Sequence, residues 1–339
     1  MTESNTQVRL AKRPVGKATR ENWEIVQEPI PTPANNQLLL KTIYVSLDPA
    51  MRGWMNDSAS YIEPVAINDV MRAGTISEVI TSNHDDFAAG DFVVGINGVQ
   101  QYALSNGENL QKIDPRLAPL PRYLNTLGMP GMTAYFGLLD TGKPQEGETV
   151  VISGAAGAVG AVVGQIAKIK GCRVVGIAGG KEKCEYLINE CGYDAAVDYR
   201  EGNLAVALKN ACPKGVDVFF DNVGGEILDT VLTQINFKAR IVICGAISQY
   251  NNTQPIKGPS NYLSLLIKRA RMEGIIVFDN AKSYGKAAIE MAGWMQQGKL
   301  KGKEHIVKGI EKFPETLNML FESKNFGKLV LQVNDDPTQ

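Results

Sequence analysis

A glycine-rich segment near the middle of the chain offers the most specific chemistry in this sequence. The apolar run Val150–Ile152 predicts a strand, a turn of very small residues follows it, and the apolar spacing after the turn predicts a helix. In this context the pattern G-x-G-x-x-G indicates a dinucleotide site, because glycines let the backbone approach a pyrophosphate and the helix N-terminus attracts it. Ala155, Gly157 and Gly160 occupy the three small-residue positions, with Ala155 replacing the first glycine. The predicted pyrophosphate contacts are Ala155, Gly157, Ala158, Val159 and Gly160. The alternative is a glycine-rich turn that binds no ligand.

The end of the next predicted strand, residues 172–178, indicates which dinucleotide binds. An NAD site usually carries Asp or Glu at this point, where the carboxylate holds the ribose 2′-hydroxyl. Here Gly179 and Gly180 follow the strand, and Lys181 and Lys183 come next. Glycines leave room for a 2′-phosphate and lysine supplies positive charge for it, so we expect NADP(H). The alternative is that both lysines are ordinary solvated surface charges.

Composition and charge are those of an ordinary globular protein. The chain has 339 residues, of which 44% are hydrophobic and 21% charged, and its formal net charge is −1. The length suits two domains, the charge balance disfavours a nucleic-acid surface, and no apolar run reaches membrane-spanning length. The N-terminal residues lack the apolar stretch of a secretory signal. We therefore expect a cytoplasmic protein whose partner is a small molecule rather than a nucleic acid or a membrane.

Cysteine and histidine are too scattered to predict a metal site. The five cysteines are Cys172, Cys184, Cys191, Cys212 and Cys244, and the two histidines are His84 and His305. A structural zinc site needs four clustered ligands, and a catalytic zinc needs three that converge. An odd set of cysteines without close pairs also suits a reducing compartment better than a disulfide framework. We expect no metal.

The N-terminal third, residues 1–126, is predicted to be mostly β. Alternating or apolar runs at 22–27, 37–45, 73–80 and 91–95 are separated by turn residues. Their spacing favours a small, partly open β-barrel over a repeat of strand and helix.

The pattern changes over residues 127–300, where predicted strands and helices alternate. Strands are expected at 149–153, 172–178, 194–198, 216–221, 239–244 and 272–278, and helices near 159–170, 181–191, 204–212, 225–235, 260–270 and 283–297. This alternation predicts a doubly wound parallel sheet, and six strands complete a Rossmann domain. Over residues 301–339 the strand-like runs 303–307 and 328–333 are expected to return to the first domain.

Five separated motifs give the chain a more specific likeness. In order they are Val45-Ser-Leu-Asp-Pro-Ala-Met-Arg52, Leu127-Gly-Met-Pro-Gly-Met-Thr-Ala-Tyr135, Phe220-Asp-Asn-Val-Gly-Gly225, Cys244-Gly-Ala-Ile-Ser-Gln-Tyr-Asn251 and Asn325-Phe-Gly-Lys328. With these motifs and two such domains, the chain resembles the zinc-independent medium-chain dehydrogenases/reductases, and among them the prostaglandin/leukotriene reductase family. That family also contains the plant alkenal double-bond reductases and the bacterial curcumin reductases.

The resemblance implies a GroES-like fold for the β domain and NADPH-dependent reduction of the C=C bond of α,β-unsaturated ketones and aldehydes. Hydride would pass to the β-carbon, and a hydroxyl donor would stabilise the charge that builds on the carbonyl oxygen. The resemblance also implies a homodimer, usually formed through the Rossmann domain.

Several cofactor contacts follow from the resemblance. They are Gly180, Lys183 and Tyr199 near the 2′-phosphate, Asn222, Cys244 and Ile247 at the carboxyl ends of the fourth and fifth strands, Met129 and Thr133 along the cofactor, and Asn325 at the nicotinamide end. Asn222 has the alternative of forming an Asx turn before two glycines. Met129 has the alternative of packing in the core.

The substrate side is less constrained by motifs. Tyr250 is our candidate for the hydroxyl that faces the substrate carbonyl, and its alternative is an amphipathic tyrosine packed at the rim of the site. Ala50 stands where the family often has tyrosine, so the pocket is expected to be wider or to use Tyr44, Tyr61 or Tyr262 instead. Arg52 is a further candidate, directed either towards the cofactor or towards Asp48.

Two other functions remain open from the sequence. A quinone oxidoreductase of the zeta-crystallin-like type would have the same domains and cofactor but different motifs at the site. A non-catalytic NADP(H)-binding sensor or structural protein would keep the fold without turnover.

Overall fold

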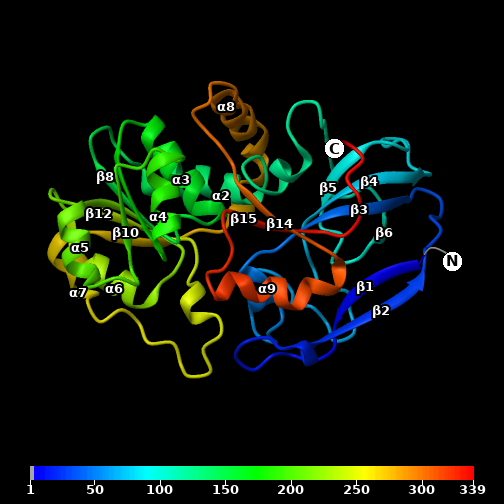
Figure 1. Ribbon diagram of the computed structural model, residues 1–339, viewed down its shortest axis with the longest axis horizontal. Coiled ribbons are helices and arrows are strands. Elements are labelled where there is room, and N and C mark those ends of the chain that lie inside the picture. The colour runs from blue at the N-terminus through cyan, green and yellow to red at the C-terminus, as the bar shows by residue number, and fades with distance from the viewer. Residues whose placement is uncertain (1–3) are drawn as a thin grey trace. The chain divides into compact units, whose positions relative to one another are not determined.

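The computed structural model describes residues 4–339, which form two compact units (Figure 1). One unit contains the N-terminal residues up to Leu124 together with Glu304–Gln339, and the other is Asn125–Lys303. The divisions expected from the sequence, at 126/127 and 300/301, lie within three residues of these. No helix in the described part of the chain is long and apolar enough to cross a membrane.

The second unit contains a six-stranded sheet in which every neighbouring pair is parallel. Its strands are β8 (Thr149–Ser153), β9 (Arg173–Ala178), β10 (Ala195–Asp198), β11 (Val216–Asp221), β12 (Ile235–Ile243) and β13 (Arg271–Gly274). Their order is β10-β9-β8-β11-β12-β13. This is the doubly wound Rossmann order, in which successive strands are added outward from the centre in both directions. The fold class expected from the sequence is confirmed. The point where the direction of winding changes lies between β8 and β11.

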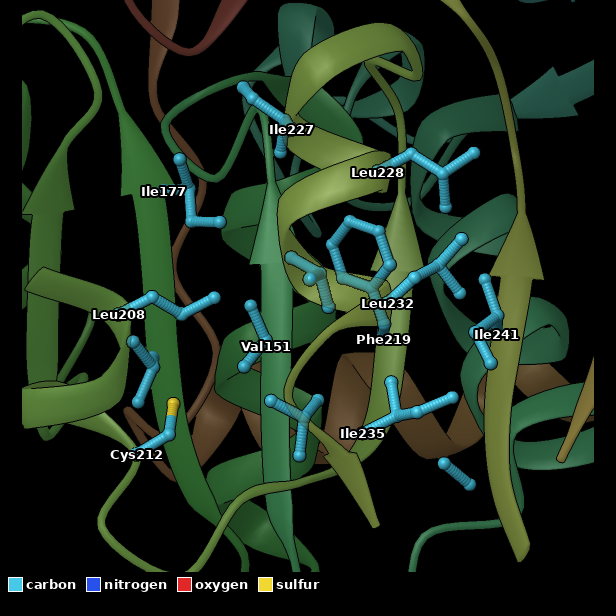
Figure 2. Close-up of a cluster of buried hydrophobic side chains, with 14 of the residues drawn as sticks. Val151, Ile177, Leu208, Cys212, Phe219, Ile227, Leu228, Leu232, Ile235 and Ile241 are labelled. Carbon is cyan, nitrogen blue, oxygen red and sulfur yellow. The ribbon is translucent and has the colours of Figure 1, made fainter. Parts of the chain in front are cut away.

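Helices connect these strands and cover the sheet. They are α2 (Met129–Phe136), α3 (Ala158–Ile169), α4 (Lys181–Asn189), α5 (Leu204–Ala211), α6 (Gly225–Leu232), α7 (Leu263–Lys268) and α8 (Tyr284–Gln296). Figure 2 shows the packing on one face, where Leu208 of α5 and Leu232 of α6 lie over Val151 and Phe219 of the sheet. Burying such apolar side chains supplies the main stabilisation of the layer.

The first unit is built on a seven-stranded sheet with the order β14-β15-β3-β4-β5-β7, and β6 also pairs with β3. The strands are β3 (Leu38–Ser46), β4 (Thr75–Ser82), β5 (Phe92–Gly95), β6 (Tyr102–Ser105), β7 (Gln111–Ile113), β14 (Glu304–Lys308) and β15 (Lys328–Gln332). A ribbon of β1 (Ser4–Leu10) and β2 (Trp23–Pro29) joins residues 69–71 and 99–101 through backbone hydrogen bonds. The result is a partly open β-barrel, and the helices α1 (Ala50–Trp54) and α9 (Phe313–Phe321) complete this unit.

Some expected elements differ from the structure. The strand expected at 272–278 ends at Gly274, and a 3₁₀ helix follows at Val277–Ser283. The strand expected at 239–244 begins at Ile235, because Ile235 already pairs with Val216 of β11. The backbone is left-handed at Lys238 (φ 59°), and pairing with β11 resumes at Arg240. Helix α2 was not expected as a separate element.

Candidate functional site

The turn after β8 has the geometry of a pyrophosphate cradle. Gly154 adopts φ +57°, so the residue that needs glycine's conformational freedom precedes Ala155. Ala155 is fully buried and its amide donates to the carbonyl of Ile177 at 3.1 Å, which explains why a small side chain is accepted there. A Cβ added to Gly160 would lie 2.5 Å from the carbonyl oxygen of Gly154, so this position must remain glycine.

Helix α3 begins directly at this turn. Gly157 precedes its first residue, and the carbonyl of Gly157 accepts the amide of Ala161 at 3.0 Å. The amides of the first helical residues, Ala158 to Gly160, have no acceptor within the helix. They lie at the positive end of the helix dipole, which favours an anion there.

The strand ends of β9 and β10 bring together a second set of predicted residues. A Cβ added to Gly179 would lie 2.8 Å from the ring of Tyr199 and from Nε of Arg200, so both side chains cross the strand end. Lys183 lies close by, and its pKa is lowered by burial and by the positive charge of Arg200. Two cations held near each other beside glycines form a site that suits a dianionic phosphate.

The structure gives Lys181 and Lys183 different surroundings, and it adds Arg200, which the sequence analysis missed, to the predicted 2′-phosphate site. Lys181 is exposed and pairs with Glu185 along α4, so it fits the alternative of a solvated charge. Arg200 was not among the predicted contacts, although its guanidinium lies 5.7 Å from the centre of the Tyr199 ring. Its position immediately after Tyr199 was the available signal.

Asn222 follows β11 and is fastened to the end of β8. Its side-chain amide donates to the carbonyl of Ser153 at 2.7 Å, and its backbone amide donates to Oγ of Ser153 at 2.8 Å. The turn before the glycines is indeed an Asx turn, but the side chain that caps it is Asp221, which accepts the amides of Val223 and Gly224. Asn222 therefore does not form the Asx turn that was its alternative.

The loop after β12 carries Tyr250 and packs on the loop after β11. The amide of Ile247 donates to the carbonyl of Asn222, and the amide of Ser248 donates to that of Val223. The hydroxyl oxygen of Tyr250 accepts the amide of Ala246 at 3.1 Å. A hydrogen bond accepted by a hydroxyl polarises its O–H group and makes it a better donor.

Cys244 begins this loop with a protonated thiol. Burial and the nearby Asp221 raise its pKa to about 12. At neutral pH the side chain is therefore a thiol that can pack or donate weakly, and it is a poor nucleophile.

The remaining predicted contacts of this unit lie on helices. Met129 and Thr133 are half-buried one turn apart on α2, and the hydroxyl of Thr133 donates to the carbonyl of Met129. Tyr262 precedes α7 and is largely exposed, and its neighbour Asn261 is held by Asp229 of α6. The binding roles of these side chains stay predictions.

In the first unit, Arg52 was expected to be directed either towards the cofactor or towards Asp48, and its contacts are different. Its guanidinium donates to the carbonyls of Gly16 and Pro14 and to the side chain of Asn56, and the residue is 4% exposed. Asp48 instead pairs with Lys328 at 2.7 Å. Arg52 thus fastens the loop at residues 14–16 to α1, which corrects its assignment as a pocket residue.

Two other predicted positions in that unit are connected by the same ion pair. Ala50 begins α1, two residues after Asp48, and Asn325 precedes Lys328 in a short loop. The amide of the Asn325 side chain donates to the carbonyl of Gly327 at 3.1 Å. The Asp48–Lys328 contact therefore holds together the segments that carry Ala50 and Asn325.

No group of three histidine, cysteine, aspartate or glutamate side chains gathers at one point within residues 4–339. Two carboxylates, Asp198 and Asp221, end β10 and β11, and Asp221 is occupied by protein donors. The other polar groups at the strand ends of the second unit are hydroxyls, amides, a thiol and two cations, which suit a phosphate-bearing ligand better than a metal ion.

Two family models match the chain. One, described as the N-terminal domain of oxidoreductase, matches residues 6–113, and the other, described as zinc-binding dehydrogenase, matches residues 158–293. The two matches fall in the first and second structural units respectively.

Similar proteins extend over nearly the whole chain. The NADPH-dependent curcumin reductase of Escherichia coli (strain K12) is 45% identical over 335 residues, covering 96% of both chains. The NADP(+)-dependent 2-alkenal reductase of Nicotiana tabacum is 40% identical over 338 residues, covering 98% of both. Among solved structures, CurA from Vibrio vulnificus in complex with NADPH has a TM-score of 0.93 at 46% identity, covering 98% of this chain and 100% of that one.

Proposed function

We propose, because this chain belongs to the medium-chain dehydrogenase/reductase family of alkenal reductases, that it reduces the C=C bond of α,β-unsaturated ketones and aldehydes with NADPH. The observation that carries this proposal is the pairing of a pyrophosphate cradle with a cationic 2′-phosphate site on one sheet edge. Both occur in a chain whose relatives include a curcumin reductase and a 2-alkenal reductase.

The side chains present fit NADP(H), the cofactor of this chain. A Cβ at Gly160 would meet the backbone of Gly154 and Ala155, so glycine there lets α3 begin directly at the cradle. A Cβ at Gly179 would meet the side chains of Tyr199 and Arg200. The amides at the start of α3 would hold the pyrophosphate, and Lys183, Arg200 and Tyr199 would hold the 2′-phosphate. When bound, NADPH supplies the hydride that reaches the β-carbon of the substrate.

Tyr250 is proposed to donate a hydrogen bond from its hydroxyl to the substrate carbonyl oxygen, which stabilises the enolate formed by hydride addition until the α-carbon takes up a proton. Negative charge develops on that oxygen as the β-carbon is reduced, so a donor aimed at it lowers the barrier. The amide of Ala246 supports this role, because its hydrogen bond to the tyrosine oxygen strengthens the tyrosine as a donor. The proposal needs no metal, since the hydroxyl performs the polarisation that a metal would otherwise supply.

We also propose a cytoplasmic homodimer formed through the second unit. β13 is an edge strand of its sheet, and neighbouring α7 exposes Leu263, Leu266 and Ile267. An edge strand offers unpaired backbone groups, and exposed apolar side chains beside it favour a self-complementary contact. A second copy of this chain provides both complements at once. Tyr262 lies at the start of this surface, and either a pocket or a dimer role is compatible with its exposure.

The experiment that tests the function is NADPH oxidation with a panel of enals, enones and quinones, followed through the nicotinamide absorbance. It is repeated with NADH and with a chelator. Chelator-resistant turnover of enones to saturated carbonyls with NADPH is expected. Turnover of quinones alone would indicate a quinone oxidoreductase, and tight NADPH binding without any turnover would indicate a sensor or structural protein.

A further inference from the structure

A buried carboxylate connects the strand ends of the second unit. Asp221 is the last residue of β11, and it is 1% exposed. Its Oδ1 accepts the hydroxyl of Ser153 at 2.6 Å, the amide of Val223 at 2.9 Å and the amide of Gly224 at 3.0 Å. Burying a carboxylate is costly unless such donors satisfy it, so the contacts define one orientation of this side chain.

The main chain of the same residue holds a third segment. The carbonyl of Asp221 accepts the amides of Cys244 at 2.9 Å and Gly245 at 3.1 Å. Ser153 in turn accepts the amide of Asn222 with its hydroxyl oxygen, so it donates to Asp221 and receives from the next residue. The ends of β8 and β11 are thereby joined through the side chains of Ser153 and Asp221, and the end of β12 is joined to them through the main-chain carbonyl of Asp221.

This junction lies at the point where the winding of the sheet changes direction, between β8 and β11. In a doubly wound sheet the two halves of a dinucleotide bind on opposite sides of that point. Lys183 and Arg200 lie on the side of β9 and β10, whereas the loops at 222–225 and 244–250 lie on the side of β11 and β12. The second side is the one that receives the nicotinamide half.

We propose that Asp221 and Ser153 are positioning residues that fix the loops after β11 and β12 against the turn after β8. They set the place of the nicotinamide half of the cofactor without touching it. This inference rests on the proposed function only in that NADPH binds at these strand ends; it does not depend on which substrate is reduced.

The test compares two ligands in the full-length protein. NADPH uses both halves of the site, and adenosine 2′,5′-bisphosphate uses only the half on β9 and β10. Ser153→Ala removes the hydroxyl that joins β8 to β11, and it is expected to weaken NADPH about tenfold, as expected for one hydrogen bond to a charged group. Binding of the bisphosphate is expected to stay unchanged. Asp221→Asn removes the charge and places an NH2 group where Oδ2 accepts the amide of Gly224 at 3.2 Å, and it is expected to change the ratio of the two affinities further.

Asp217→Asn is the matched control, because Asp217 lies at the opposite end of the same strand. Its carboxylate accepts the amide of Thr149 at 2.8 Å and the side chain of Asn236 at 2.7 Å. This variant is expected to lower thermal stability without changing the ratio of the two affinities. Circular dichroism establishes that each variant is folded.

Three results would overturn the positioning role. The first is an equal loss of affinity for NADPH and for the bisphosphate in Ser153→Ala. The second is the same change in the ratio of the two affinities in Asp217→Asn. The third is loss of the fold in both Ser153→Ala and Asp221→Asn. Failure of the enone reaction looks different, since wild-type protein would then bind NADPH with no turnover and the affinity ratio would remain measurable. Wild-type protein that does not bind NADPH would overturn both proposals.

Discussion

At the scale of single residues, we expect cofactor preference to depend on the cations beside Gly179. Lys183→Ala and Arg200→Ala are each expected to raise the KM for NADPH about tenfold, because each removes a charge-assisted hydrogen bond to the 2′-phosphate. NADH lacks that phosphate, so its KM is expected to remain nearly the same. Steady-state kinetics with both cofactors measures the difference.

Lys181→Ala is the control for this pair, because that lysine is exposed and bonded to Glu185 on its own helix. It is expected to leave both KM values unchanged. Equal effects of Lys183→Ala on NADPH and NADH would remove the lysine from the 2′-phosphate site.

Tyr250 gives a second residue-scale prediction. Tyr250→Phe keeps the ring and removes the hydroxyl, so turnover of enones is expected to fall on the order of 10²-fold, the usual effect of losing one donor to a developing oxyanion. The Kd for NADPH is expected to change little. Unaltered turnover with several enones would show that the tyrosine only packs at this point.

The sequence predicted the positions that require glycine better than it predicted the contacts of polar side chains. The need for glycine at residue 160 follows from its place in a known pattern, and the structure shows the close backbone approach that the pattern implies. The connection of Asp221 to Ser153 could not be predicted, because it joins strands 68 residues apart through side chains that no motif pairs. The contacts of Arg52 could not be predicted for the same reason, because its acceptors are backbone carbonyls of a loop that is distant in the sequence.

At the scale of elements, the contact between α3 and the turn after β8 is the most restrictive. Gly160→Ala would force a methyl group against backbone atoms of Gly154 and Ala155, which cannot rotate away as a side chain can. Overpacking of this kind costs about 1–3 kcal/mol, and displacement of α3 would also weaken NADPH binding. Thermal unfolding and cofactor titration measure the two effects.

Gly293→Ala is the control, because among the described residues nothing beyond the adjacent residues and backbone of α8 itself lies within 4 Å of the added methyl. Alanine there is expected to stabilise the helix by about 0.5–1 kcal/mol. A Gly160→Ala protein that keeps both its stability and its NADPH affinity would contradict the close-packing argument.

Elements of the second unit were predictable where a strand is a buried apolar run, as β8, β9 and β11 are, or where a helix has an apolar face, as α3 and α6 do. β8 and β11 have the bounds that the sequence predicts. Errors occurred where long-range pairing decides the outcome. β12 includes the polar residues from Asn236 to Lys238 because its first residue pairs with β11, and β13 ends early because it has only one neighbour.

At the scale of the whole molecule, the dimer proposal depends on the apolar side chains of α7. Leu266→Glu and Ile267→Glu place charges on residues that are 76% and 69% exposed, so folding of one chain is expected to tolerate them. Association is expected to fail, because a buried unpaired charge is costly. Light scattering would then report the mass of one chain, 36.8 kDa, in place of two.

Ile289→Glu serves as the control, because Ile289 is 77% exposed on α8, a helix that packs against α2 and the 3₁₀ helix Val277–Ser283. It is expected to leave the mass unchanged. A wild-type protein that already has the mass of one chain would refute the dimer.

The first unit is discontinuous in the chain, and this affects how the protein is made. β3 lies near the start of the sequence. Its neighbour β15, which pairs with residues Tyr44–Ser46 of β3, lies within the last dozen residues. During synthesis the intervening unit emerges complete, so it can fold while this part of β3 has β4 on one side but still lacks β15 on the other. A largely apolar strand with one free edge is open to wrong pairing with other chains. A nascent chain that stalls before Lys328 is therefore exposed to aggregation through its first domain, although its cofactor domain has already folded.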